Sequence, residues 1–190
     1  GISIGKLCLY TLCAGVSPYN TLPIMLDVGT DNSDRLNDPL YLGLHQKRVR
    51  GERYQSFVDH FVAAVGKVFP NVLLQWEDFK KGNAFTLLDK YRSSLPSFND
   101  DIQGTAAVVA AGVAAAGRAT GTPLTEQRFL WVGAGAAGGG IARHISHELE
   151  AAGLDEDELS AALGLVDTQG FVTNDSPVLD EHKVSVSWPA

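Results

Sequence analysis

Three features are scarce in this sequence: cysteine, long apolar runs and positive charge. It contains only two cysteines, Cys8 and Cys13, fewer than a disulfide framework or a cysteine-based zinc site requires. Both lie in an apolar segment, so we expect buried, reduced thiols and a cytoplasmic protein.

The other two absences bear on partners. No stretch approaches the roughly 20 apolar residues of a membrane span, because the alanine-rich run 106–116 is short and contains Gly112. Lys and Arg number 15 against 22 Asp and Glu, a net charge of −7, whereas nucleic-acid binding needs clustered positive charge. We therefore expect neither a membrane nor a nucleic acid as partner.

Apolar runs alternate along the chain with segments of helical periodicity, which favours an α/β fold with parallel strands. Neither end has an obvious cap or a charged leader, so we expect a piece of a longer protein. The expected strands are 22–29, 72–76, 129–132 and 163–167, with a loop or short strand at 96–101; the expected helices are 4–14, 54–68, 83–92, 104–120 and 138–153, with a short one beginning at 34–36.

Two pairs of adjacent carboxylates are the most informative feature. Glu77 and Asp78 follow an expected buried strand, and Asp100 and Asp101 lie in the segment 96–101. Ligands of open α/β sheets gather at the carboxyl ends of strands, and converging carboxylates form the hard oxygen set that Mg²⁺ or Mn²⁺ prefers. These acids therefore indicate a divalent metal site, with ordinary solvated loop acids as the alternative.

A glycine-rich turn follows the strand expected at 129–132. Its pattern, G-x-G-x-x-G between a strand and a helix, is the dinucleotide-binding fingerprint. The glycines admit the pyrophosphate to backbone N–H groups at a helix N-terminus carrying about +0.5 charge. A purely structural turn is the alternative. The predicted cofactor contacts are Gly133, Gly135, Ala136, Ala137 and Gly138.

Asp167 ends the next expected strand, where an acid typically holds the adenosine ribose hydroxyls. Its charge would repel a 2′-phosphate, which favours NAD over NADP, although NADP stays possible. Two further glycines, Gly139 and Gly140, are expected to loosen the first turn of the following helix.

Lys6 interrupts an apolar helix start, where a desolvated lysine can have a lowered pKa and act as a general base. A snorkelling surface lysine is the alternative. His144 and His147 lie three residues apart, but their order matches neither H-E-x-x-H nor H-x-x-E-H, so we expect a solvated helix face.

Several long motifs resemble the malic enzyme family across essentially the whole chain. They are Gly5-Lys6-Leu7-Cys8-Leu9-Tyr10-Thr11, Leu26-Asp27-Val28-Gly29-Thr30, Asp38-Pro39-Leu40-Tyr41-Leu42-Gly43, Gln75-Trp76-Glu77-Asp78-Phe79 and Phe98-Asn99-Asp100-Asp101-Ile102-Gln103-Gly104-Thr105-Ala106. The one departure is Trp76, where the family more usually has Phe.

The resemblance implies oxidative decarboxylation of L-malate to pyruvate and CO₂ with reduction of NAD(P)⁺. It implies that Lys6 takes the proton from the malate hydroxyl and that Asp100 lies beside Lys6 and tunes its charge. Glu77, Asp78 and Asp101 are implied as ligands of Mg²⁺ or Mn²⁺. A malolactic enzyme, which converts malate to lactate with bound NAD, is similar enough to remain the alternative.

The resemblance also implies a domain division. Residues 1–99 would be part of a catalytic α/β domain, and 100–190 the first half of a Rossmann-like NAD(P)-binding domain. The family's tyrosine acid, malate-binding arginine and pocket asparagines would lie outside the chain. The isolated polypeptide is therefore expected to have little or no activity, and the full-length protein to be a homo-oligomer.

Overall fold

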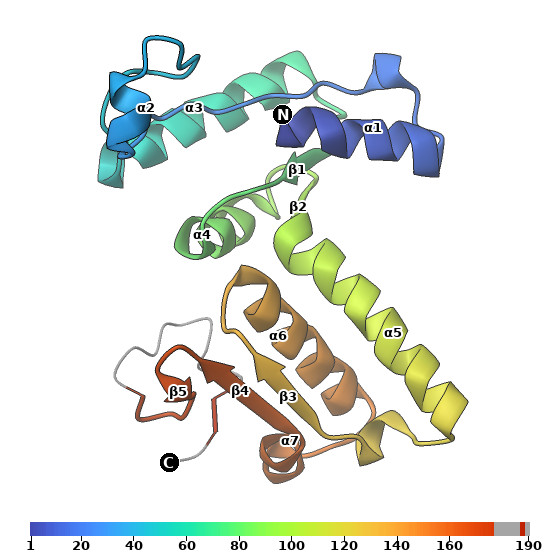
Figure 1. The fold of residues 1–190 in the computed structure, drawn as a ribbon. Helices are drawn as coiled ribbons and strands as arrows, with labels where there is room; N and C mark the ends of the chain where they lie inside the picture. Colours follow the sequence, from blue (N-terminus) through green and yellow to red (C-terminus); the bar gives the residue numbers. More distant parts are fainter. Residues whose placement is uncertain (177–186, 189–190) are drawn as a thin grey trace. The chain divides into compact units, whose positions relative to one another are not determined.

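The chain divides into two units, Gly1–Val72 and Leu73–Ala190. A computed structural model describes residues 1–176 and 187–188 (Figure 1).

The first unit is built from helices and extended chain. Its helices are α1 (Ile2–Ala14), the short 3₁₀ turn η1 (Pro18–Asn20), α2 (Ser33–Asn37) and α3 (Gly51–Val68). The periodicity of the longest one, α3, predicts one apolar face that includes Phe57, Val58 and Val65. Val58 and Val65 are buried as predicted, but Phe57 is exposed. Gly15, in the left-handed conformation, ends α1, as expected of a helix stop.

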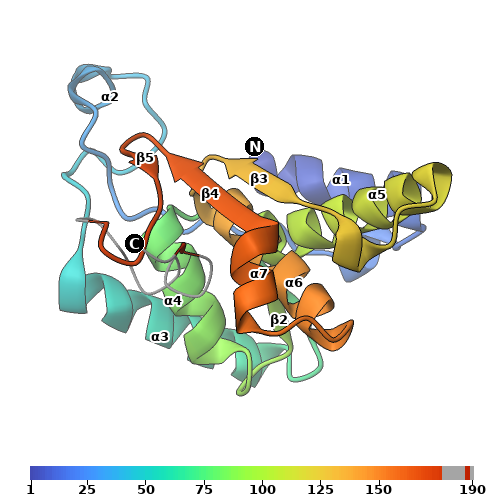
Figure 2. The same cartoon turned by 90° about the horizontal axis from the view of Figure 1, so that it is seen from below.

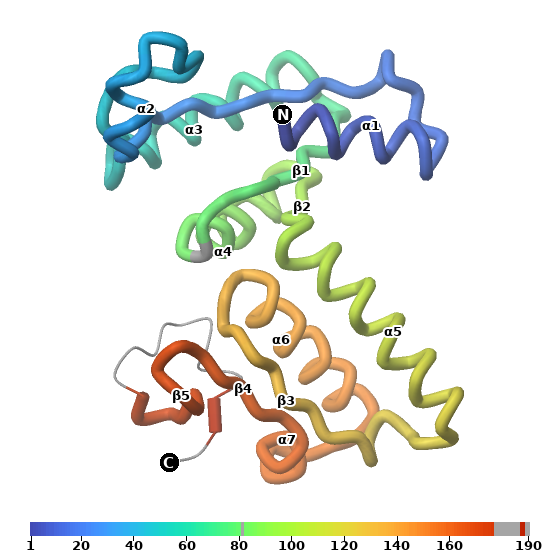
Figure 3. The backbone as a smooth tube through the Cα atoms, viewed as in Figure 1, coloured from blue at the N-terminus to red at the C-terminus, as the bar shows by residue number. Residues whose placement is uncertain are grey.

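The strand expected at 22–29 is wrong. This segment is extended but pairs with no strand: Figure 1 draws it without an arrow, and Figure 3 traces its path between α1 and α2. Its backbone instead bonds to a loop: the Val28 carbonyl accepts from the Val49 N–H at 2.8 Å, and the Thr30 N–H donates to the Gln46 carbonyl at 2.9 Å. An apolar run predicts burial, but a strand also needs a partner.

The expectation of buried cysteines is also wrong. Cys8 and Cys13 are both free and exposed. The reason is that α1, although apolar, buries none of its residues. Apolar composition gives a tendency to burial, but burial also requires a neighbouring element that covers the helix.

The second unit contains all the strands among the described residues. A parallel pair is formed by β1 (Leu74–Trp76) and β2 (Ser97–Asn99), joined through α4 (Lys81–Tyr91). A three-stranded sheet follows in the order β3 (Phe129–Val132), β4 (Leu163–Asp167), β5 (Gly170–Phe171). The β3–β4 pair is parallel and β5 is antiparallel, turning back at the end of β4 (Figure 2).

Helices connect these strands. A π-helical turn, η2 (Asp100–Gly104), leads into α5 (Thr105–Thr120), and the short turn η3 (Leu124–Glu126) precedes β3. Next come α6 (Ala136–Ala151) and α7 (Glu156–Ala162). Helix α6 contacts α5 on one side and the β3–β4 pair on the other (Figure 1). The predicted α/β class, with a Rossmann-like start, is confirmed.

The stretch Asp100–Thr120 meets the length and hydropathy criteria for a membrane span, with a mean hydropathy of 1.2 and 11% of it buried. These criteria are weak evidence, because the core helix of a soluble protein also meets them. The stretch starts with two aspartates and contacts α6.

Gly29 yields a stability prediction. It has φ +84°, and a Cβ there would lie 2.6 Å from the Gln46 carbonyl oxygen; Gly51 has φ +62° with open space around it. Gly29→Ala in the full-length protein should lower the free energy of unfolding by about 3 kcal/mol, and Gly51→Ala by only about 1 kcal/mol. Urea denaturation measures both. Equal losses would contradict the close backbone approach at Gly29.

Candidate active site

The register of the β1–β2 pair brings the two acid pairs together. Trp76 is opposite Asn99, so Glu77–Asp78 and Asp100–Asp101 leave adjacent parallel strands at the same end. A hydrogen bond joins them, from the Asp78 N–H to Oδ2 of Asp101 at 2.9 Å. Acids separated by more than 20 residues in sequence thus lie side by side.

Asp78 has an unusual backbone. Its φ of +60° is the only positive value at a non-glycine residue among those described. Aspartate tolerates this left-handed region better than most residues, yet such conformations typically cost about 1–3 kcal/mol and cluster at functional sites. In this conformation the Asp78 N–H donates to Asp101, which lies in the turn after the neighbouring strand.

Asp100 and Asp101 begin the π-helical turn η2. Such turns are rare and are often found at functional sites. Gly104 gives the Asp100 side chain room inside this turn, because a Cβ there would overlap Oδ1 of Asp100 and make that carboxylate move. The Thr105 hydroxyl donates to the Asp100 carbonyl at 3.2 Å, which ties the turn to the start of α5.

These acids suit a metal ion in the type of their ligand atoms and in their position at neighbouring strand ends. Glu77, Asp78 and Asp101 supply hard carboxylate oxygens at neighbouring strand ends, as a divalent cation requires. Among the described residues, however, no three His, Cys, Asp or Glu side chains are already gathered to hold an ion. Glu77 Oε2 accepts from Gln75 Nε2 at 2.7 Å, so its carboxylate already has a donor within the chain.

Lys6 lies in the first unit, on α1, and is half-buried. The predicted metal acids and Asp100 belong to the second unit. The pairing of Lys6 with Asp100 therefore stays a prediction.

The glycine turn joins β3 to α6. Gly133 has φ +114°, and its N–H donates to the Val166 carbonyl at 2.7 Å, which anchors the turn to β4. A Cβ on Gly138 would overlap the Gly133 carbonyl oxygen, whereas a Cβ on Gly135 would meet nothing within 4 Å. The first and third glycines thus close the turn, and the second leaves its surface open.

Ala136 and Ala137 start α6 directly after this turn. Asp167 ends β4, next to the turn, since Val132 pairs with Val166. Its Oδ1 accepts from the Gln169 N–H at 2.7 Å. The predicted cofactor residues therefore lie at one end of the β3–β4 pair, beside an open helix N-terminus that favours negative charge.

The expectation for Gly139 and Gly140 is wrong. Both lie within α6 and are buried, rather than loosening its first turn. A Cβ on Gly140 would lie 2.9 Å from the Ile102 carbonyl oxygen, so α6 rests directly on the acid-bearing turn η2. The sequence shows that glycine is flexible, but it does not show where the absence of a side chain lets another segment approach closely.

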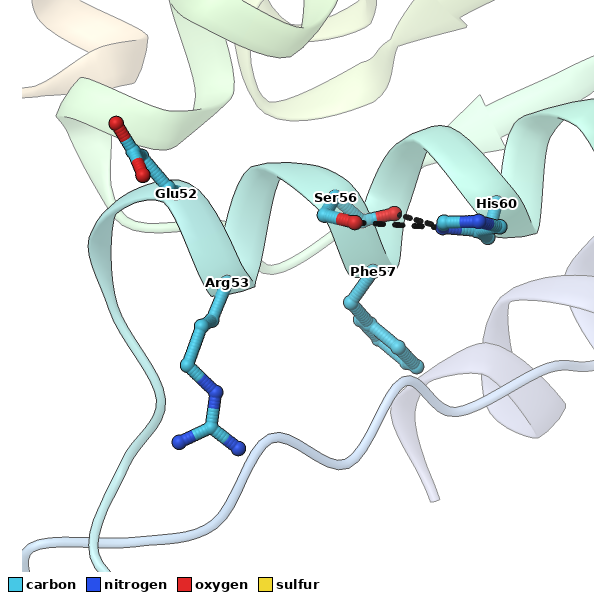
Figure 4. A pocket seen from close by; sticks show the side chains of 5 residues that line it. All are labelled: Glu52, Arg53, Ser56, Phe57 and His60. Atoms are coloured by element: carbon cyan, nitrogen blue, oxygen red, sulfur yellow. Dashed lines mark hydrogen bonds between the residues drawn. The ribbon is translucent and has the colours of Figure 1, made fainter.

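A shallow, open hollow of about 510 Å³ lies elsewhere, along α3 in the first unit (Figure 4). His60 Nδ1 bonds the Ser56 carbonyl there at 2.6 Å. None of the predicted site residues lines it. Its lining residues are Glu52, Arg53, Ser56, Phe57 and His60.

Two family models match this sequence, one in each part of the chain. The model described as "Malic enzyme, N-terminal domain" matches residues 1–92, and "Malic enzyme, NAD binding domain" matches residues 102–187.

Curated relatives include the NAD-dependent malic enzyme of Pectobacterium atrosepticum, 52% identical over 179 residues, which are 94% of this chain and 32% of the relative. That of Pseudomonas aeruginosa is 50% identical over 187 residues, 97% of this chain and 33% of the relative. The chain therefore spans about a third of the length of these relatives.

Solved structures of low sequence identity share the fold. The malic enzyme of Entamoeba histolytica superposes with a TM-score of 0.64 at 24% identity, over 91% of this chain and 30% of that one. The NAD-dependent malic enzyme of Thermotoga maritima gives 0.57 at 22% identity, over 76% of this chain and 37% of that one.

Gly139 and Gly140 form a matched pair for a test of the α6–η2 contact. In the full-length protein, Gly140→Ala should lower the free energy of unfolding by about 1–3 kcal/mol, because the added methyl group meets the Ile102 backbone. Gly139→Ala, whose Cβ would lie 3.9 Å from the Phe85 ring, should be neutral or slightly stabilising. Thermal and urea unfolding measure both, and a tolerated Gly140→Ala would contradict the close contact.

Proposed function

The chain belongs to the malic enzyme family, and from this premise we propose that the protein carrying it oxidises and decarboxylates L-malate to pyruvate and CO₂ while reducing NAD⁺, with a divalent cation. The register of β1 against β2 carries the proposal, because it sets the two acid pairs side by side at one strand end. The names of the curated relatives support NAD as the cofactor.

We assign the cation to Glu77, Asp78 and Asp101. When bound, Mg²⁺ or Mn²⁺ would polarise the malate C2 oxygen and stabilise the negative charge that develops as CO₂ departs. The chain's own contribution is to present three carboxylates from two adjacent strands. The Asp78 N–H to Asp101 hydrogen bond supports this assignment, since it keeps the two strand tips in contact.

We assign the proton transfer to Lys6, which removes the proton from the malate C2 hydroxyl as hydride leaves C2. Asp100 adjusts the charge of Lys6. A positioned general base contributes about 10²–10⁴-fold to a rate. The amine must be neutral to accept the proton, so neighbouring charge sets the pH range in which Lys6 is active.

We assign the cofactor to the turn between β3 and α6. Gly133, Gly135 and Gly138, with Ala136 and Ala137 at the helix start, bring backbone N–H groups to the pyrophosphate. Asp167 accepts hydrogen bonds from the adenosine ribose hydroxyls and disfavours a 2′-phosphate there. NADP is then a poorer substrate than NAD.

We further propose the domain division at residues 99 and 100, with part of the catalytic domain before it and the start of the NAD-binding domain after it. The family models, which end at 92 and begin at 102, support this division. Residues 177–186 and 189–190 of the second domain lie outside the described residues. A cytoplasmic location and a homo-oligomeric full-length protein complete the proposal, along with inactivity of the isolated 190-residue chain.

The experiment that tests this function uses the full-length protein. Malate-dependent reduction of NAD⁺ is followed with Mn²⁺ and with EDTA, while pyruvate and lactate are assayed. We expect metal-dependent NADH and pyruvate in equal amounts. Lactate without net NADH would contradict the proposal and indicate malolactic chemistry.

Lys6→Ala should lower kcat by about 10³-fold and change the Mn²⁺ dissociation constant less than threefold, because a general base adds rate without ligating the cation. Lys6→Arg is the matched variant: it keeps the positive charge but does not lose its proton in the working pH range. We expect it to be equally slow. Near-normal turnover by Lys6→Arg would leave Lys6 only a charge role.

Asp167→Ala should raise the KM for NAD⁺ by about 10-fold, the loss of a hydrogen bond to a charged group, and should change the KM for NADP⁺ far less. Asp157→Ala removes the same charge from the first turn of α7 and serves as the control. Initial-rate kinetics with both cofactors decide the matter. Equal losses for NAD⁺ and NADP⁺ would remove Asp167 from ribose recognition.

A further inference from the structure

The acid-bearing turn η2 is held at its base by two reciprocal side-chain bonds. Asn99 Oδ1 accepts from the Ile102 N–H at 3.2 Å. Gln103 Oε1 accepts from the Asn99 N–H at 3.0 Å. Each of these two side chains satisfies a backbone donor near the other end of the same segment, as the two residues of a helical capping box do. In sequence, Asp100 and Asp101 lie between the two bonded ends.

The buried position of Asn99 makes the turn depend on its side-chain oxygen. Its side chain is fully buried, at 0% exposure, and it ends β2 opposite Trp76. Its Nδ2 has no hydrogen-bond partner among the described residues. Burying an amide with one side unsatisfied is costly, and an apolar side chain would avoid that cost but could not accept from Ile102. The fold therefore depends here on the acceptor oxygen.

Gln103 is placed differently. Its side chain is exposed, so it contributes little to the core, and its bond to the Asn99 N–H is the contact that it makes with the base of the turn. That N–H belongs to the last residue of β2, directly before Asp100. Gln103 therefore acts on the geometry of the acids rather than on the packing of the unit.

The turn η2 is also hydrogen-bonded to the residue that follows the neighbouring strand β1. Asp101 Oδ2 accepts from the Asp78 N–H at 2.9 Å, so a shift of the turn would move Asp101 relative to Glu77 and Asp78. A carboxylate displaced by even 1 Å is a poor ligand for Mg²⁺, which demands near-ideal octahedral geometry.

From these contacts we propose that Asn99 and Gln103 are positioning residues, which lock the Asp100–Gly104 turn so that Asp101 meets the divalent cation together with Glu77 and Asp78. The inference rests on the proposed function, because it takes those three acids as the cation's ligands. Neither side chain touches the reacting atoms; both act through the backbone of the turn.

The test compares three single variants of the full-length protein with the parent and with a Glu77→Ala, Asp78→Ala double variant. Gln103→Ala removes the acceptor oxygen. Gln103→Glu keeps an acceptor oxygen on a side chain of the same length, and Gln127→Ala is the control. Gln127 likewise bonds the backbone through its side-chain amide, but as a donor, from Nε2 to the Thr122 carbonyl near the opposite end of α5. Mn²⁺ affinity is measured by electron paramagnetic resonance titration without substrate, NAD⁺ affinity by fluorescence, and amide exchange of the segment 98–105 by mass spectrometry.

We expect Gln103→Ala to weaken Mn²⁺ binding roughly tenfold and to speed amide exchange in 98–105, with NAD⁺ affinity within twofold of the parent. Gln103→Glu should return both quantities to within threefold of the parent, and Gln127→Ala should change neither. Equal Mn²⁺ affinity in Gln103→Ala and Gln127→Ala would overturn the inference alone. A parent protein that binds Mn²⁺ no better than a Glu77→Ala, Asp78→Ala variant would overturn the proposed metal site and the inference with it.

Discussion

The parallel pairing of β1 with β2 is the constraint on which the rest of the candidate site depends. With Trp76 opposite Asn99, the chain must leave both strands at one edge, and it leaves each of them through two acids. A register shifted by one residue would turn the side chains at the strand ends to the other face. Buried Trp76 and Asn99, at 1% and 0% exposure, fix that register from within.

The turn η2, which carries Asp100 and Asp101, and the glycine turn between β3 and α6 pack against the same core cluster. Ile102, at the centre of η2, belongs to a core cluster with Phe85 and Leu88 of α4, and Ala136 at the start of α6 packs against that cluster. Gly140 lets α6 approach the Ile102 backbone. Helix α6, whose N-terminus we assign to the pyrophosphate, therefore packs against η2, the turn that we assign to the cation. The two proposed sites thus share packing contacts.

The sequence predicted the second unit better than the first. The bounds expected for β3 and β4 match those observed, because each is an apolar run closed by a glycine or an acid. The run at 22–29 has similar composition, yet it bonds to a loop through Val28 and Thr30, and no local pattern records the absence of a partner strand. Cys8 is exposed for a similar reason: the sequence does not record whether another element covers α1.

The proximity of the two acid pairs could be expected from their places after strands, since parallel strands gather their carboxyl ends. The π-helical turn, the left-handed Asp78 and the clamp by Asn99 and Gln103 could not. They arise from hydrogen bonds between particular side chains and backbone groups in the fold, which residue type and spacing do not specify.

The most direct test of the proposed metal site is a crystal structure of the full-length protein with Mn²⁺, recorded for anomalous scattering of the metal. We expect one strong anomalous peak, about 2.0–2.3 Å from carboxylate oxygens of both acid pairs, with Glu77, Asp78 and Asp101 among its ligands. A peak bound by only one pair, or none at this edge of β1 and β2, would contradict it.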